Sequence, residues 1–326
     1  MQAKTLFDLY SKNFALVREK YSIKLPADVA KDFAECVVCP TCLNMHNATC
    51  LDPQSEFPLT VEHLPSEKLA GKPLILTCRP CNNRAGAKLD SALKLFYKVE
   101  PFVTGKENSS VDATITIGGN FKARTTVTQK TIDGKPFFDF KHRINKERMD
   151  KYNELLKNIH GEEFRFTFWR PNSRNVEIAI LRIGYLLAFA KLGHSFVVGS
   201  GNHQNIREQI ANPDKKILPS FGACASPKLP INEQGLFILI FDDGFKCTYV
   251  SFEIEHEGKK EMIGVMLPPS KVNDLDFYNT YAKLVESKAL KAYRSAKLYR
   301  EDYLYNPDGI SEIHNIYNAI EAGKLK

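Results

Sequence analysis

The sequence predicts an α+β protein in which a small cysteine-rich ββα unit near the N-terminus is followed by a larger mixed α+β domain. Six of the eight cysteines fall within residues 36–81, which marks that stretch as a separate unit. Apolar residues make up 43% of the 326 residues, enough for two domains with sizeable cores. A segment containing Pro, Gly, Asn and Ser at residues 101–110 predicts the boundary, which gives domains 1–108 and 109–326.

The N-terminal domain is expected to begin with a helix over residues 3–20, where apolar residues recur at helical spacing. Residues 59–63 alternate apolar and polar side chains, as in a short strand that ends at His63. Pro65 and Gly71 then shape a loop that leads into a second strand. The other elements expected in this domain are a short helix at 27–34, a strand at 73–77 and a helix at 82–97.

The second domain alternates strand-like and helix-like segments, with turn signals such as Asp133-Gly134 and Asp242-Asp243-Gly244 between strands. An apolar helix is expected to stop at Gly193, a residue type common just after a helix end. The expected strands are 112–117, 121–129, 136–141, 164–168, 236–241, 246–254 and 260–267, and the expected helices are 146–159, 176–191, 203–210, 277–301 and 309–322.

Two CxxC knuckles carry the strongest chemical signal in the chain. They are Cys39-Pro40-Thr41-Cys42 and Cys78-Arg79-Pro80-Cys81. A CxxC turn brings two sulfurs to one side, and two such turns close a tetrahedral site of the kind zinc prefers. In a reducing compartment, such a cluster indicates metal binding rather than disulfides. We therefore expect Cys39, Cys42, Cys78 and Cys81 to hold structural Zn²⁺.

The first knuckle has an alternative register, because Cys36-Val37-Val38-Cys39 is also a CxxC sequence. We favour Cys39 with Cys42, since a Cys-Pro-x-Cys turn suits a knuckle and the two valines resemble core residues. Cys50 is a weaker alternative ligand.

Residues enclosed by the knuckles could hydrolyse a phosphodiester. Glu62 and His63 lie between them, and Asn82 follows the last cysteine directly. A neutral histidine can take a proton from water near pH 7, and a neighbouring carboxylate can hold Mg²⁺. Zinc bound by four thiolates has no open position, so a second divalent cation is implied. Alternation along a strand would turn Glu62 and His63 to opposite sides, so their cooperation depends on the local geometry.

This pattern resembles the HNH endonuclease family over about residues 36–97. The matching residues are the two knuckles, Glu62-His63, Pro65, Gly71, the run 76–82 and Gly86. The resemblance implies a zinc-stapled ββα-metal fold that binds a catalytic divalent cation, Mg²⁺ or Mn²⁺.

The resemblance also assigns roles to single residues. His63 would be the general base, Glu62 a ligand of the catalytic cation, and Asn82 the residue that holds the base through its loop. The family places a further metal ligand on the following helix, where this chain has no histidine. Asp90 lies near the usual spacing and is our choice, with Asn83 as the rival on the same helix face.

The charge balance permits a nucleic-acid partner without requiring one. The net charge is +7, with +2 in residues 1–108 and +5 in the remainder. Beside the expected site, Arg79, Arg84 and Lys88 are candidates for phosphate contacts. The basic residues of segment 288–300 favour a solvated helix surface. A cytoplasmic location is expected, because no signal-like or membrane-spanning apolar run is found.

These observations predict a Mg²⁺- or Mn²⁺-dependent endonuclease acting on DNA, with RNA left open as a substrate. By analogy, an HNH unit joined to a larger domain suits a restriction or defence nuclease. The alternative is a non-catalytic zinc module that binds nucleic acid or protein. A third possibility is a nuclease that stays silent until the C-terminal domain binds a regulatory partner or ligand.

Overall fold

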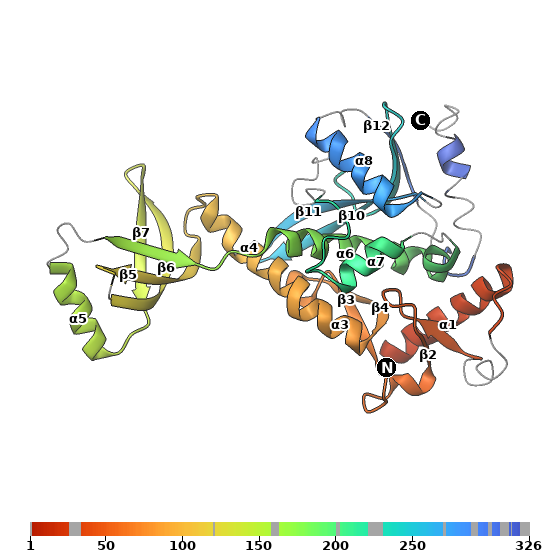
Figure 1. Cartoon of the computed structure of the whole chain (residues 1–326), viewed down its shortest axis with the longest axis horizontal. Helices are drawn as coiled ribbons and strands as arrows, with labels where there is room; N and C mark the ends of the chain where they lie inside the picture. The colour runs from red at the N-terminus through yellow and green to blue at the C-terminus, as the bar shows by residue number, and fades with distance from the viewer. Residues whose placement is uncertain are drawn as a thin grey trace. The chain divides into compact units, whose positions relative to one another are not determined.

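The computed structural model divides into two compact units (Figure 1). Unit 1 comprises Met1–Ser91 and Ser173–Lys326, and unit 2 comprises Ala92–Asn172. The predicted α+β class is confirmed, since helices accompany four antiparallel sheets in the part of the chain described. The structure describes residues 2–25, 34–119, 121–157, 163–199, 203–220, 231–269, 272–287, 293–298, 302–306, 313 and 315–319.

This division differs from the boundary expected at residue 108. Helix α4 (Ser91–Val103) belongs to unit 2, because Val99 and Phe102 pack with Val111, Ala113 and Val127 of its sheet. After residue 172 the chain returns to unit 1. The segment 101–110 therefore contains the end of α4 and its connection to the first strand of the unit 2 sheet, all within unit 2.

The N-terminal part of unit 1 surrounds the cysteines. Helix α1 (Gln2–Lys20) buries Phe7, Tyr10, Phe14 and Val17 at helical spacing, as expected. Two antiparallel hairpins follow, and the second leads directly into helix α3, so the predicted strand, loop, strand, helix order is present. The elements are β1 (Cys36–Val38), β2 (Met45–Asn47), η1 (Ala48–Leu51), β3 (Leu59–Leu64), η2 (Glu67–Leu69), β4 (Lys72–Cys78), α3 (Arg79–Ala85) and the π-helical turn η3 (Gly86–Asp90).

The C-terminal part of unit 1 is built around helix α6 (Ser173–Leu192), most of whose side chains are buried. This helix packs on a four-stranded sheet so closely that a Cβ at Gly184 would lie 2.8 Å from Val265 Cβ. It also contacts β3, β4 and η3. The sheet has the order β11-β10-β9-β12, and the elements are η4 (Ser195–Gly199), α7 (Gln204–Ala211), β9 (Gly235–Phe241), β10 (Lys246–His256), β11 (Lys259–Leu267), α8 (Asp274–Glu286) and β12 (Tyr293–Lys297).

One expected helix is wrong. The segment 277–301 was expected to be helical throughout, but α8 ends at Glu286 and residues 293–297 form strand β12. The edge of β9 offers backbone hydrogen-bonding groups, and β12 pairs with it antiparallel from Tyr293 to Lys297. This long-range pairing outweighs the local helical pattern.

The expected helix at 27–34 falls almost wholly outside the described residues, as does much of the one at 309–322. None of the helices described is long and apolar enough to cross a membrane.

Unit 2 is a four-stranded antiparallel sheet of order β7-β6-β5-β8 with helices α4 and α5 (Lys146–Lys157). Its strands match the expected ones closely: β5 (Ser110–Ile117), β6 (Phe121–Ile132), β7 (Lys135–His142) and β8 (Phe164–Phe168). Alternate residues of β5 and β6 are buried against Phe102 and Tyr152, whereas the intervening residues stay accessible. The sheet therefore has one packed face and one open face.

Candidate functional site

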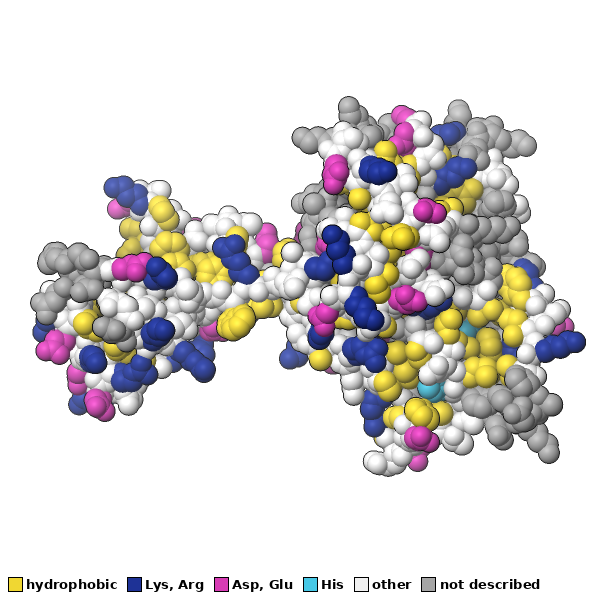
Figure 2. All heavy atoms as spheres, viewed as in Figure 1, with side chains coloured by type: hydrophobic (Ala, Val, Ile, Leu, Met, Phe, Trp, Pro, Cys, Tyr) yellow, Lys and Arg dark blue, Asp and Glu magenta, His cyan; other side chains and the backbone are white. Residues whose placement is uncertain are grey.

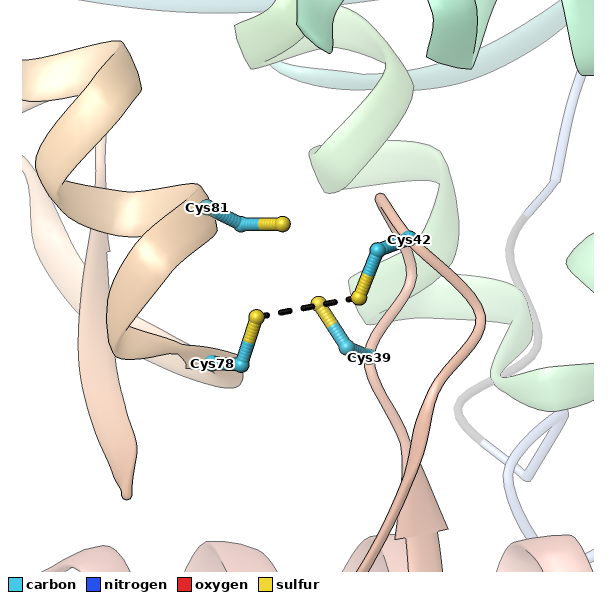
Figure 3. Close-up of side chains that lie close together, drawn as sticks. All are labelled: Cys39, Cys42, Cys78 and Cys81. Carbon is cyan, nitrogen blue, oxygen red and sulfur yellow. Dashed lines mark hydrogen bonds between the residues drawn. The ribbon is translucent and has the colours of Figure 1, made fainter. Parts of the chain in front are cut away.

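The four predicted zinc ligands lie together. The sulfur atoms of Cys39, Cys42, Cys78 and Cys81 are all within 4.8 Å of one another, and no other such His/Cys/Asp/Glu group occurs in the described part of the chain (Figure 3). The first two come from the loop after β1, and the last two from the junction of β4 and α3. Four sulfurs in this arrangement suit one tetrahedral Zn²⁺.

The first knuckle uses Cys39 and Cys42, as the preferred register predicted. Its turn is closed by a hydrogen bond from Leu43 N to Cys39 O of 2.9 Å. Cys36 instead packs in an apolar cluster with Phe14 and Val38, and burial raises the pKa of its thiol. Cys36 is thus a core residue and not a ligand.

Proton sharing among the four thiols fits a cation-binding site. The hydrogen bond from Cys39 lowers the pKa of Cys78 to about 5 and holds that of Cys42 far below its usual range. The pKa values of Cys39 and Cys81 rise in turn, because hydrogen bonds to the neighbouring sulfurs hold their protons, and repulsion between thiolates adds to the rise. A divalent cation among the sulfurs would remove this conflict, since thiolates are the form that binds zinc.

His46 of strand β2 is a further residue of this site that the sequence pattern did not single out. Its imidazole is 2% exposed, and neither ring nitrogen has a protein hydrogen-bond partner. Burial opposes its charge, but the thiols of Cys42 and Cys78 raise its pKa to about 10. The imidazole therefore faces the sulfur cluster as a neighbouring cation. Its position four residues after Cys42 was the available signal.

Helix α6 and the residue after its end position the first knuckle. Tyr185 donates a hydrogen bond of 2.7 Å to Pro40 O, inside the knuckle. His194 Nε2 accepts from Val38 N at 3.1 Å, and its Nδ1 lies 2.9 Å from Asn13 Oδ1. Both ring nitrogens of this fully buried histidine are used, and burial lowers its pKa to about 3, so the imidazole is neutral.

The β3–β4 hairpin presents Glu62 and His63 differently. A register shift lies between these two residues. Glu62 is 3% exposed, whereas His63 is half-buried. Gly71 closes the loop of the hairpin, because a Cβ there would lie 1.5 Å from Pro65 O. Glu62 is therefore the buried side chain of the pair, and His63 is the accessible one.

Glu62 and Asp90 converge on one cation, the guanidinium of Arg182 from α6. Arg182 Nη2 lies 2.8 Å from Glu62 Oε2, and Nη1 lies 3.5 Å from Asp90 Oδ1. Thr77 Oγ1 also donates to Glu62 Oε2 at 3.2 Å. Burial raises the pKa of Glu62, and Arg182 opposes that rise. The two carboxylates expected to hold a metal are thus brought together, with an arginine between them.

Asn82 links α3 to the strand that carries His63. Its Nδ2 donates to Thr60 Oγ1 at 2.9 Å, and Thr60 Oγ1 donates to Thr77 O at 3.2 Å. Asn83, the alternative to Asp90, is exposed on the same helix. Asp90 shares Arg182 with Glu62, so the geometry favours Asp90 over Asn83.

The three basic residues expected at the site each contact the protein itself. Arg79 Nη2 donates to Pro53 O at 2.8 Å, and Arg84 Nη1 donates to Ala211 O at 3.3 Å. Lys88 pairs with Asp214. The side chains of Arg84 and Lys88 remain exposed, so both are accessible to solutes.

Comparison with protein-family models, with curated proteins and with solved structures found no match to this chain.

Proposed function

We propose that this chain is a divalent-metal-dependent endonuclease of the HNH type that hydrolyses DNA. The observation that carries the proposal is the convergence of Glu62 and Asp90 on one cation position, within a ββα unit whose helix starts at the cysteine cluster. The half-buried His63 follows Glu62 directly on β3. One unit thus combines a candidate base and a candidate cation site.

In this proposal His63 accepts a proton from water while the water oxygen attacks phosphorus, and the bond to the leaving sugar oxygen breaks. Glu62 and Asp90 would hold Mg²⁺ or Mn²⁺, which would offset negative charge on the phosphate. Asn82 fastens α3 to β3 by its hydrogen bond to Thr60. The cysteine cluster would hold Zn²⁺ and take no part in the reaction.

Arg182 sets a condition on this mechanism. Its guanidinium already pairs with both carboxylates, so a catalytic cation must compete with it. The longer contact, 3.5 Å to Asp90, is the one expected to yield first.

Arg84 and Lys88 are the proposed phosphate contacts at this site, because both are exposed on α3 and η3. Arg79 is more restricted, since its guanidinium donates to Pro53 O. We place the reaction in the cytoplasm, where reduced thiols favour metal binding. A defence role and cleavage of RNA are extensions of the same proposal.

The burial of Glu62 favours a second candidate, a non-catalytic zinc module that binds nucleic acid or protein. Glu62 is 3% exposed and is already satisfied by Arg182 and Thr77. In this alternative the triad of Glu62, Arg182 and Asp90 only fastens α6 to the ββα unit.

A plasmid-nicking assay with Mg²⁺, Mn²⁺ or Ni²⁺ separates the two candidates. The nuclease predicts cleavage by the wild type, loss of cleavage in His63→Ala and in Asp90→Asn, and retained cleavage in the matched variant Asn83→Ala. Zinc content and circular dichroism should be unchanged in all three variants. Full activity of His63→Ala would refute the assignment of the base, and inert wild-type protein would favour the zinc module.

A further inference from the structure

The two faces of the unit 2 sheet differ sharply in composition. On β5 the buried residues Val111, Ala113, Ile115 and Ile117 face the core formed with α4 and α5. The open face carries the alternate residues of the four strands, which are mostly basic or threonine. They include Asp112, Thr114 and Thr116 of β5, Lys122, Arg124 and Thr126 of β6, Lys141 of β7, and Arg165 and Thr167 of β8.

The strand register arranges these side chains in rows across the sheet. Thr116 lies between Arg165 and Lys122, which places a cation on each side of a hydroxyl. In the next row Thr114 lies between Thr167 and Arg124. Residues in such rows are neighbours about 5 Å apart, so they can act on one ligand together.

Two hollows on this face adjoin each other. One of about 530 Å³ is lined by Arg124, Arg143 and Trp169, and one of about 470 Å³ is lined by Lys122 and Arg165. Both share Thr114 and Thr167 in their walls, so together they form a shallow track across the strands.

The track is electropositive. Four cations line it, against the carboxylates Asp112 and Glu163. Asp112 is already paired with Lys98 at 2.7 Å and with Arg143 at 2.9 Å. Unit 2 as a whole has 15 lysines and arginines against 10 aspartates and glutamates, which accounts for +5 of the chain's net charge of +7. Figure 2 shows several of these basic side chains on the visible surface of unit 2. The four cations are Lys122, Arg124, Arg143 and Arg165.

Trp169 at the end of β8 adds an aromatic platform. Its indole is 84% exposed, which is unusual for a residue type that is highly buried on average. An exposed ring beside cations and hydroxyls is the combination by which proteins bind single strands, because cations follow the backbone while bases stack on aromatic rings. In a duplex the bases are already stacked on one another and offer no free face.

We infer that the open face of the unit 2 sheet binds single-stranded nucleic acid, with Arg124, Lys122 and Arg165 on the phosphates and Trp169 stacked on a base. This inference goes beyond the proposed nuclease, because it concerns the binding of single strands by unit 2 alone. It would survive a failure of the proposed catalysis, since its test measures binding alone.

Fluorescence anisotropy on the full chain carrying His63→Ala tests the surface. The probes are a labelled 20-nucleotide oligo(dT), the same length of oligo(U), and a 20-base-pair duplex, in buffers of increasing salt. We expect both single strands to bind at least tenfold more tightly than the duplex, with affinity falling as salt rises. A difference between oligo(dT) and oligo(U) then tells whether the 2′-hydroxyl contributes.

Three further variants locate the binding. Trp169→Ala and Lys122→Ala/Arg124→Ala should each lower single-strand affinity about tenfold. Lys157→Ala, which removes an exposed cation from α5, is the matched control and should change it less than twofold. Three results would overturn the inference: tighter binding of the duplex, no binding of single strands, or equal effects of the three variants. Binding that depends on Trp169 in a chain that never nicks plasmid would uphold it while refuting the proposed nuclease.

Discussion

Replacing Arg182 by methionine should destabilise unit 1 severely. The Arg182 side chain is 3% exposed and Glu62 is 4% exposed, so the substitution leaves an uncompensated carboxylate in the interior. Removing one partner of a buried ion pair costs about 3–5 kcal/mol. For a unit of more than 200 residues, this corresponds to a fall in melting temperature of about 6–20 °C. Urea and thermal unfolding at pH 7.5, with zinc present, measure the effect.

A double variant shows whether the buried charge is the cause. Glu62→Gln removes the charge but keeps an acceptor for Thr77, so Glu62→Gln/Arg182→Met should be more stable than Arg182→Met alone. Lys260→Met is the control, because its pair with Glu253 is exposed and its loss should change stability little. The reasoning fails if Arg182→Met costs under about 1 kcal/mol, or if the double variant shows no recovery.

Arg182→Met alone also tests the proposed catalysis. The double variant does not, because it additionally removes the Glu62 carboxylate, which is a proposed metal ligand. If a catalytic cation competes with Arg182 for Glu62 and Asp90, removing the guanidinium should lower the Mn²⁺ concentration needed for cleavage at a temperature where the variant is folded. An unchanged Mn²⁺ requirement would restrict the triad to a structural role.

Three further predictions concern the zinc unit. Cys78→Ser should lose one zinc per chain by elemental analysis, whereas Cys36→Ser should retain it, because Cys36 packs with Phe14 outside the sulfur cluster. His46→Ala should lower zinc affinity about 10–100-fold in a chelator competition, since the imidazole faces the thiols; an unchanged affinity would make it a packing residue. Burial lowers the pKa of His194 to about 3 in the folded chain. Between about pH 6.5 and pH 3 the unfolded chain therefore binds more protons than the folded chain, and stability decreases as the pH is lowered. Urea unfolding should show a loss of about 2 kcal/mol from pH 7 to pH 5 that is smaller in His194→Gln.

Local patterns predicted the elements well because most of them are set by neighbouring residues. The CxxC spacing brought the correct four cysteines together, and periodicity located α6, β5, β6 and the β9–β11 meander. Strand β12 was missed because its stability comes from β9, more than 50 residues earlier in the sequence. The return of the chain to unit 1 at Ser173 was missed for the same reason, since no change of composition marks it.

The candidate site was predicted in its residues but not in its electrostatics. Glu62 and Asp90 could be named from a short motif, because both lie within or beside the segment that the two CxxC knuckles enclose. Arg182 could not, since it comes from α6, 92 residues after Asp90, and nothing in its sequence neighbourhood marks it as different from a core helix residue. The missing information is the tertiary contact by which Arg182 pairs with both carboxylates.

The contacts of α6 also change the meaning of the C-terminal part of the chain. From sequence it was a separate domain, with binding, sensing or partner roles. In the structure, Arg182 and Tyr185 of α6 and the adjacent His194 reach the carboxylates, the first knuckle and strand β1. The same helix is packed on β11 through Gly184. The ββα unit therefore shares its core with the C-terminal sheet, and any ligand that shifts α6 would act directly on Glu62 and on the first CxxC knuckle. Under the proposed function, regulation would pass through Arg182, because this residue decides whether the two carboxylates are available to a cation.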